Sequence, residues 1–259
     1  MKARLTLVLA LAAAPAFAQA PAPAAPAVAF EQHLGARLPL DAGFIDSSGR
    51  AVRLRDESPP SGPPTLLMLG YHRCPQLCGL ATQGVLEALR QGDVAARVVF
   101  VSVDPGETAA EAADKRRADV GYARLLAGDD ARATPAIERL VGPPASIAAL
   151  ASAVGFVYRA GDATNRFAHP AGVVVVTPDG RVSRYLMGVR FDPAALREAV
   201  EAARRERIGT PSDRLALLCA HLDPRTGTHT GAVMTLARLV GLATLALLAT
   251  LAWRHREGR

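Results

Sequence analysis

The sequence predicts an α/β domain built on a central sheet with helices on its faces, and three observations lead to this prediction. Continuous apolar runs, typical of buried strands, cover 65–71, 97–103 and 172–177. Segments with helix-start signals follow the first two runs. A hairpin and a closing helix are expected after the third. This order is that of a thioredoxin-like fold, with a mixed central sheet flanked by helices.

The strands are justified in order along the chain. Segments 38–45 and 51–54 have strand composition and are separated by a turn at 46–49. The proline-rich stretch 58–64 cannot enter a strand interior, so it is expected to be a loop. The run 65–71 is then the expected central strand, because it has no polar alternation.

Helices are predicted between and after these strands. The first begins at Cys74-Pro75, because proline is tolerated in the first turn of a helix. Thr108 and Glu111 form a capping-box pattern for the second, which extends to about residue 127. A third is expected at 146–154, and strands 172–177 and 182–187 lead to a fourth, capped by Asp192 and ending near 207.

Both ends of the chain carry membrane-targeting patterns. Residues 1–18 combine a basic head, an apolar run and a small-x-small site, as in a cleavable secretory signal; the alternative is an uncleaved anchor. Residues 231–253 predict one C-terminal transmembrane helix, with a buried or interfacial helix as the alternative. Arginines follow it, so the positive-inside rule predicts a cytoplasmic tail at 254–259 and a periplasmic domain.

The predicted organisation is a signal peptide (1–18), a Pro/Ala linker (19–34), the thioredoxin-like domain (35–208), a juxtamembrane segment (209–230), the transmembrane helix (231–253) and the tail (254–259). The net charge of +6 comes from the ends, since 19–230 holds 24 basic and 23 acidic residues. A nearly neutral body argues against a nucleic-acid surface. We expect a single-pass inner-membrane protein whose working domain faces the periplasm.

Two of the three cysteines, Cys74 and Cys78, are four residues apart at the expected helix start. There they would project from one face, and the helix dipole would favour their thiolates. The pair could be a redox-active disulfide, a structural disulfide or part of a metal site. A bridge closing so small a loop adds little stability, whereas three intervening residues suit a soft ion such as Cu(I) or Zn.

Two sulfurs leave room for a further ligand, and the chain holds six histidines: His33, His72, His169, His221, His229 and His255. His255 would be cytoplasmic, His33 is near the linker, and His72 would have to fold back. His169 directly precedes the third core strand, in a loop expected to face the cysteine helix. Position alone leaves His169 open as a ligand or as an ordinary turn residue.

Two further features have open interpretations. Asp104 ends a predicted strand before a proline. Its carboxylate either supports the metal site or contacts a partner protein, or it is an ordinary turn carboxylate. Cys219 with His221 is either an accessory copper-relay pair or a lone juxtamembrane thiol.

Three motifs, taken together, resemble the SCO/SenC family of thioredoxin-like copper chaperones of cytochrome c oxidase assembly. They are YHRCPQLC at 71–78, VSVDP at 101–105, and FAH at 167–169 followed by VVVVTPDG at 173–180. The resemblance covers about 35–208. The chain departs from the commonest pattern at 76–79, where QLCG replaces Asp-Val-Cys-Pro, in its C-terminal anchor, and in an extra segment at 217–227.

The resemblance implies that Cys74, Cys78 and His169 bind copper, as Cu(I) and Cu(II). It further implies delivery of copper to the dinuclear site of cytochrome c oxidase subunit II, or of another copper-oxidase subunit, after loading by a periplasmic copper donor. The alternative is a thiol–disulfide oxidoreductase that uses the Cys74–Cys78 disulfide to reduce the target cysteines. A thiol peroxidase is a third possibility, which would need a single attacking cysteine and no His169.

Overall fold

The structure, a computed structural model, describes residues 28–74, 77–128, 130, 134–160 and 167–209, with 239–242, 244 and 250. The predicted signal peptide, nearly all of the juxtamembrane segment and most of the predicted transmembrane helix lie outside these residues. Within the described part of the chain, no helix has both the length and the apolar character needed to cross a membrane.

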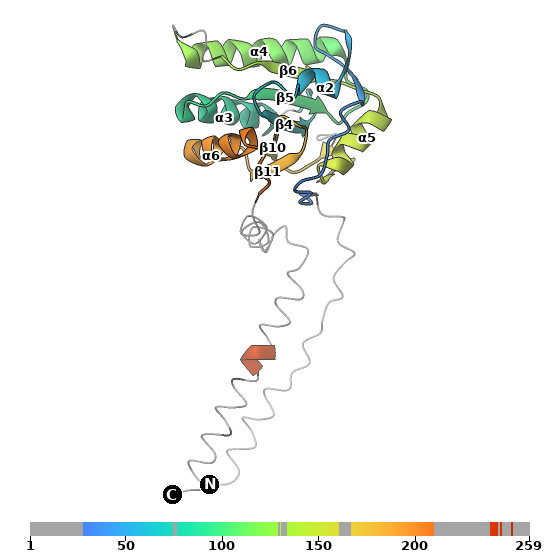
Figure 1. Cartoon of the computed structure of the whole chain (residues 1–259). Helices are drawn as coiled ribbons and strands as arrows, with labels where there is room; N and C mark the ends of the chain where they lie inside the picture. The colour runs from blue at the N-terminus through green and yellow to red at the C-terminus, as the bar shows by residue number, and fades with distance from the viewer. Residues whose placement is uncertain are drawn as a thin grey trace, which may run out of the picture.

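A five-stranded sheet of order β11-β10-β4-β5-β6 forms the centre of the domain (Figure 1). β4, β5 and β6 are parallel, whereas β10 is antiparallel to both β4 and β11. This confirms the predicted α/β thioredoxin-like fold with a mixed sheet, and the three apolar runs are its inner strands. The strand bounds are β4 Thr65–Gly70, β5 Arg97–Ser102, β6 Ile137–Leu140, β10 Gly172–Val176 and β11 Val182–Met187.

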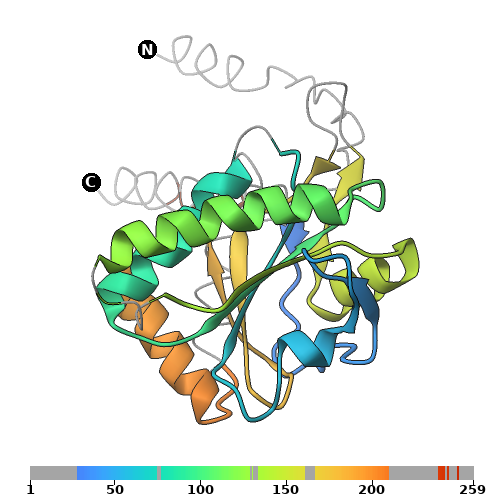
Figure 2. The same ribbon diagram turned by 90° about the horizontal axis from the view of Figure 1, so that it is seen from above.

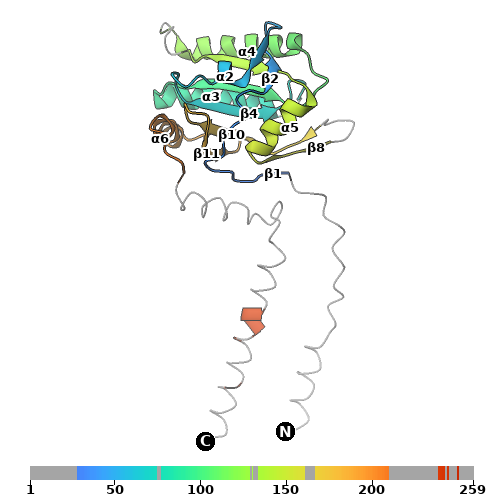
Figure 3. The same cartoon turned by 45° about the vertical axis from the view of Figure 1, so that its right-hand side comes forward.

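Both faces of the sheet are buried, which explains why its inner strands are apolar without alternation. Leu66 and Met68 of β4 point into one core, shared with α3, α4 and α6. Leu67 and Leu69 point into the other core, shared with α5 and the N-terminal segment. Figures 2 and 3 show α6 and α5 on opposite sides of the sheet. The helix bounds are α3 Leu77–Gly92, α4 Ala109–Ala127, α5 Pro144–Ala153 and α6 Pro193–Arg204.

The predicted capping signals are present. The Thr108 side chain accepts from the Glu111 backbone N–H, and the Glu111 side chain accepts from the Thr108 N–H, which completes the box at the start of α4. Asp192 caps α6 through the Ala195 N–H, and that helix ends three residues before the predicted position. The predicted strand pair near the N-terminus is confirmed as the antiparallel pair β2 (Gly43–Ile45) and β3 (Ala51–Arg53), followed by the short α2 (Leu54–Glu57).

The structure adds one strand to the sequence-based prediction of the sheet. The edge strand β6 was missed, because its central residues, Glu138 and Arg139, are charged. The described part of the cysteine helix begins at Leu77, so Cys74 precedes it in a turn in which its N–H donates to the Tyr71 carbonyl. Residues 75 and 76 and the side chain of Cys78 lie outside the described part of the structure, so the shared face of the two cysteines stays a prediction.

Short strand pairs complete the domain. β1 (Ala29–Phe30) pairs with β7 (Phe156–Val157), and Phe30 is buried in the core, so packed residues begin inside the segment assigned to the linker. β8 (Arg159–Ala160) pairs with β9 (Phe167–Ala168), which leads directly to His169 and β10.

Candidate metal centre

The carboxyl ends of the parallel strands β4 and β5 meet at one edge of the sheet, and the segments that follow them build the site. Gly70 aligns with Ser102 in the β4–β5 register, and the Val103 N–H donates to the Gly70 carbonyl. The cysteine loop, residues 71–74, therefore leaves the sheet beside the Asp104 segment. Open α/β sheets commonly form binding sites at this edge.

Cys74 lies at the end of this loop, and its side chain is half-buried. It borders a pocket of about 180 Å³ together with His72, Lys115, Tyr122 and Arg139. Cys78 lies in the first turn of α3, and its side chain is outside the described part of the structure. Among the side chains that are described, no group of three His, Cys, Asp or Glu residues is arranged to hold a metal.

His169 lies between β9 and β10 and is half-buried between two aromatic rings. Its ring centroid is 5.8 Å from that of Tyr71, with an interplanar angle of 84°, and 5.8 Å from that of Phe156. Its Nδ1 is 3.0 Å from the Pro170 carbonyl oxygen. If Nδ1 carries the proton for this bond, the lone pair is on Nε2, the form in which imidazole binds metals.

Tyr71 connects the two predicted parts of the metal site. Its ring contacts His169, and its carbonyl accepts the Cys74 N–H at 3.3 Å. Tyr71 is buried, and its ring also contacts that of Phe167, with ring centroids 5.7 Å apart, so its position is determined by packing. The structure thus brings His169 and the cysteine loop to the same buried aromatic residue.

His72 points into the interior instead. It is 2% exposed, its ring lies 5.4 Å from that of Phe100, and its Nδ1 is 3.3 Å from Nη1 of Arg139. Burial, and secondly the positive charge of Arg139, lower the pKa of His72 to about 3. His72 is therefore a neutral core histidine at physiological pH.

Arg139 is the largest feature of the site that sequence reasoning missed. It is 2% exposed, its Nε donates to Asp119 at 2.5 Å, and its guanidinium lies 4.3 Å from the centroid of the Phe100 ring. Its Nη2 also donates to Thr82 Oγ1 at 3.3 Å. A buried charge on an edge strand has no clear sequence signal, because the partners come from α3 and α4.

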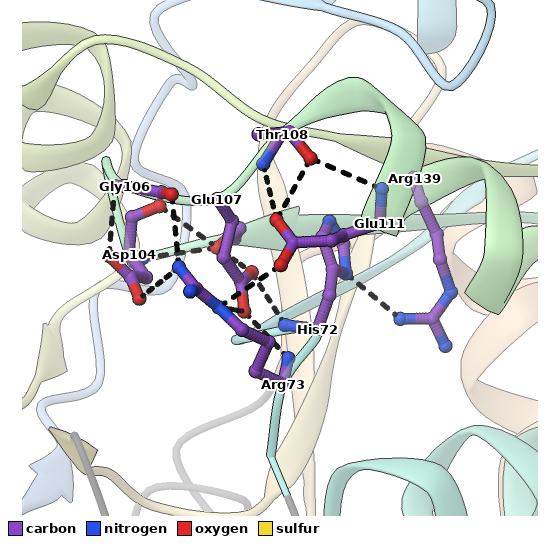
Figure 4. Close-up of polar contacts among 9 residues, drawn as sticks. His72, Arg73, Asp104, Gly106, Glu107, Thr108, Glu111 and Arg139 are labelled. Atoms are coloured by element: carbon purple, nitrogen blue, oxygen red, sulfur yellow. Dashed lines mark hydrogen bonds and ion pairs between the residues drawn. The ribbon is translucent and has the colours of Figure 1, made fainter.

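Arg73 and the carboxylates after β5 form a charged cluster beside the cysteine loop (Figure 4). The guanidinium lies 3.3 Å from Asp104, 3.5 Å from Glu107 and 3.3 Å from Glu111. Sequence reasoning singled out Asp104 but not Glu107. The ends of adjacent parallel strands meet at one edge, and this rule could have predicted the cluster.

Asp104 has the contacts of a turn carboxylate and also an ion pair with the cysteine loop. Its carboxylate accepts from the Gly106 N–H at 2.9 Å, as a turn carboxylate does, and from Arg73 of the cysteine loop at 3.3 Å. His33 contacts the Ser152 carbonyl at the end of α5. Cys219 and His221 lie outside the described residues.

Comparison with known proteins gives a family match. The family model described as SCO1/SenC matches residues 43–204. No curated protein matches the chain.

Solved structures also resemble this chain in fold, and three of them are the following. A putative electron transfer protein from Aquifex aeolicus VF5 is 22% identical, with a TM-score of 0.54, and the match covers 69% of this chain and 98% of that one. BsSco, described as a member of the Sco family of cytochrome c oxidase assembly proteins, is 19% identical, with a TM-score of 0.50 and coverage of 67% and 96%. Copper-bound ScoI from Bradyrhizobium japonicum is 24% identical, with a TM-score of 0.47 and coverage of 66% and 98%.

Proposed function

Because this chain belongs to the SCO1/SenC family, we propose that it is a copper metallochaperone of cytochrome c oxidase assembly. Its cargo, Cu(I) or Cu(II), is held by the sulfurs of Cys74 and Cys78 and by the imidazole of His169. The ion is received from a periplasmic copper donor. It is delivered to the dinuclear copper site of oxidase subunit II or of another copper-oxidase subunit.

The donor chemistry supports copper as the cargo. Thiolate and imidazole ligands select Cu(I) and Zn over hard cations such as Mg²⁺ and Ca²⁺. A site with few protein ligands leaves the ion open to an incoming thiolate, so copper can pass to the target by ligand exchange. Such a transfer changes no oxidation state when Cu(I) is the cargo.

The observation that carries the proposal is the shared contact at Tyr71. The residue three positions before Cys74 touches the ring of His169, although the two are far apart in the sequence. His33, by comparison, has its ring at the end of α5, and His72 faces the core. Among the described histidines outside the cysteine loop, His169 is therefore the one whose ring contacts that loop.

The membrane arrangement is part of the same proposal. Residues 1–18 act as a cleaved signal, 231–253 anchor the chain in the inner membrane, and the domain at 35–208 faces the periplasm. The basis is the apolar runs with their flanking arginines. A reporter fused after Arg259 should remain cytoplasmic, and an exported reporter would contradict this topology.

Anaerobic Cu(I) titration of the full chain in mild detergent tests the copper site. We expect one ion per chain, and loss of binding in Cys74→Ser and Cys78→Ser. His169→Ala should weaken Cu(II) binding and change the sulfur-to-Cu(II) absorption. His33→Ala and Cys219→Ser are the matched controls, and both should behave as the wild type.

The same variants separate the alternative functions. Unchanged copper affinity and absorption in His169→Ala, together with robust disulfide reductase activity, would favour the thiol–disulfide oxidoreductase. Peroxide turnover that does not depend on copper would favour the thiol peroxidase.

A further inference from the structure

A buried carboxylate holds the backbone of the cysteine loop. Glu107 is 6% exposed, and its Oε2 accepts from the His72 backbone N–H while its Oε1 accepts from the Arg73 backbone N–H, both at 2.6 Å. The Ser102 hydroxyl also donates to Oε2, at 2.6 Å. One side chain thus binds two consecutive amides that lie 35 and 34 residues away in the sequence.

These bonds constrain the approach of the chain to Cys74. The two amides belong to the residues directly before Cys74, and the Cys74 N–H donates to Tyr71. The three consecutive N–H groups of residues 72–74 therefore all have acceptors inside the protein. Hydrogen bonds to a buried carboxylate are stronger than bonds between neutral groups, so the loop has little freedom to move.

Arg73 makes this arrangement electrostatically possible. A buried carboxylate needs a compensating charge, and the Arg73 guanidinium lies close to Glu107, Asp104 and Glu111. Its Nη2 also donates to the Gly106 carbonyl at 3.0 Å. Arg73 therefore contacts the segment after β5 in two ways (Figure 4). Its backbone N–H donates to Glu107, and its side chain donates to the Gly106 carbonyl.

We propose that Glu107 is a positioning residue for the copper site, acting through the backbone of residues 72 and 73 to hold Cys74 beside Tyr71 and His169. The inference rests on the proposed copper-binding function, but the hydrogen bonds from the amides of residues 72 and 73 to Glu107 can be tested separately. Groups that orient metal ligands in this way commonly change metal affinity 10–100-fold when they are altered.

Glu107→Gln is the diagnostic variant. Each carboxylate oxygen of Glu107 accepts a backbone N–H. The side-chain amide of glutamine would therefore place its NH₂ group, a donor, against one of these N–H donors. We expect at least about a 10-fold loss of Cu(I) affinity, a shifted sulfur-to-Cu(II) absorption, and faster hydrogen exchange at the amides of residues 72 and 73. If this variant does not fold, Glu107→Asp replaces it, since it keeps the charge but shortens the side chain.

Glu111→Gln is the matched control, because Glu111 also contacts Arg73 but binds no backbone group of the cysteine loop. It should keep the wild-type affinity, spectrum and amide protection. Wild-type affinity and absorption in Glu107→Gln would overturn the inference, even if thermal stability fell. Rapid exchange of the two amides in the wild type would also overturn it.

The copper measurements distinguish a failure of the proposed function from a failure of the positioning role. If the wild-type chain binds no copper, the proposed function is wrong, and this role for Glu107 falls with it even if the two amides are protected. If the wild type binds copper and Glu107→Gln binds it equally well, only the positioning role is wrong.

Discussion

The imidazole of His169 stands edge-on to the phenol ring of Tyr71, with ring centroids 5.8 Å apart and ring planes at 84°. This contact joins the loop before β10 to the loop after β4. Tyr71 is therefore a direct contact between the segments that carry two of the proposed copper ligands, Cys74 and His169.

Tyr71→Leu should therefore weaken copper binding more than its effect on stability explains. The substitution retains a buried apolar side chain but removes the ring surface that His169 contacts. We expect about a 10-fold lower Cu(II) affinity, measured by competition with a chelator of known affinity. Phe44→Leu, which removes a buried ring that packs against Gly142, should lower the melting temperature but leave affinity unchanged.

Asp119→Ala should strongly destabilise the domain. It would leave the Arg139 guanidinium buried without its carboxylate partner, at an expected cost of about 3–5 kcal/mol in the free energy of unfolding. Urea unfolding monitored by circular dichroism measures this cost.

The single variant Arg139→Met and the double variant Asp119→Ala/Arg139→Met complete a double-mutant cycle. The double variant should be more stable than Asp119→Ala alone, because it removes the buried charge and retains an unbranched apolar chain near Phe100. Additive effects of the two substitutions would mean that the ion pair contributes no coupling energy.

Asp46 should make the domain acid-sensitive. Burial opposes ionisation, but hydrogen bonds from Ser48 and Arg50 outweigh it and lower the pKa of Asp46 to about 2. A folded-state pKa below the unfolded value contributes stability that is present above about pH 4 and is lost as the pH falls toward 2.

Asp46→Asn should reduce this dependence. We expect a smaller loss of unfolding free energy between about pH 4 and pH 2 than in the wild type, and roughly 1–3 kcal/mol lower stability at pH 7. Asp114→Asn alters an exposed carboxylate paired with Arg117 and should keep the wild-type pH profile. If the unfolding free energy of Asp46→Asn depended on pH as that of the wild type does, Asp46 would not be the source of the acid sensitivity.

Two helical glycines should respond to alanine in opposite directions. A Cβ at Gly84 in α3 would lie 2.2 Å from the Val189 carbonyl oxygen, whereas a Cβ at Gly121 in α4 meets nothing within 4 Å. Gly84→Ala should therefore cost about 1–3 kcal/mol by overpacking. Gly121→Ala should add about 0.5–1 kcal/mol, because alanine favours the helix. Thermal unfolding of both variants tests the pair, and a stabilised Gly84→Ala would contradict the close packing of α3 against residue 189.

Much of the fold could be predicted because its signals are local. The capping pair Thr108 and Glu111, which spans only four residues, predicts the start of α4 directly after Thr108. The proline–aspartate–glycine turn predicts the β10–β11 hairpin. The predicted start of the cysteine helix at Cys74-Pro75 stays a prediction, because the described part of α3 begins at Leu77 and residues 75 and 76 lie outside the described residues.

The candidate site was predictable only in part. Three short motifs predict Cys74, Cys78 and His169 as the copper ligands, and this stays a prediction, to which the structure adds Tyr71 as the contact between two of their segments. Glu107 and Arg73 could not be paired from local pattern, because their contact depends on the register of β4 against β5.

The sequence by itself determined the inner strands β4, β5 and β10 and the helix caps, because continuous apolar runs must be buried on both faces and cap residues act on their immediate neighbours. It also determined the family, through motifs that lie within 43–204. Only the tertiary structure decided that His72 faces the core beside Arg139 and that Glu107 binds the cysteine loop. These contacts span 67 and 35 residues, and they arise from strand alignment and helix packing, which no local pattern encodes.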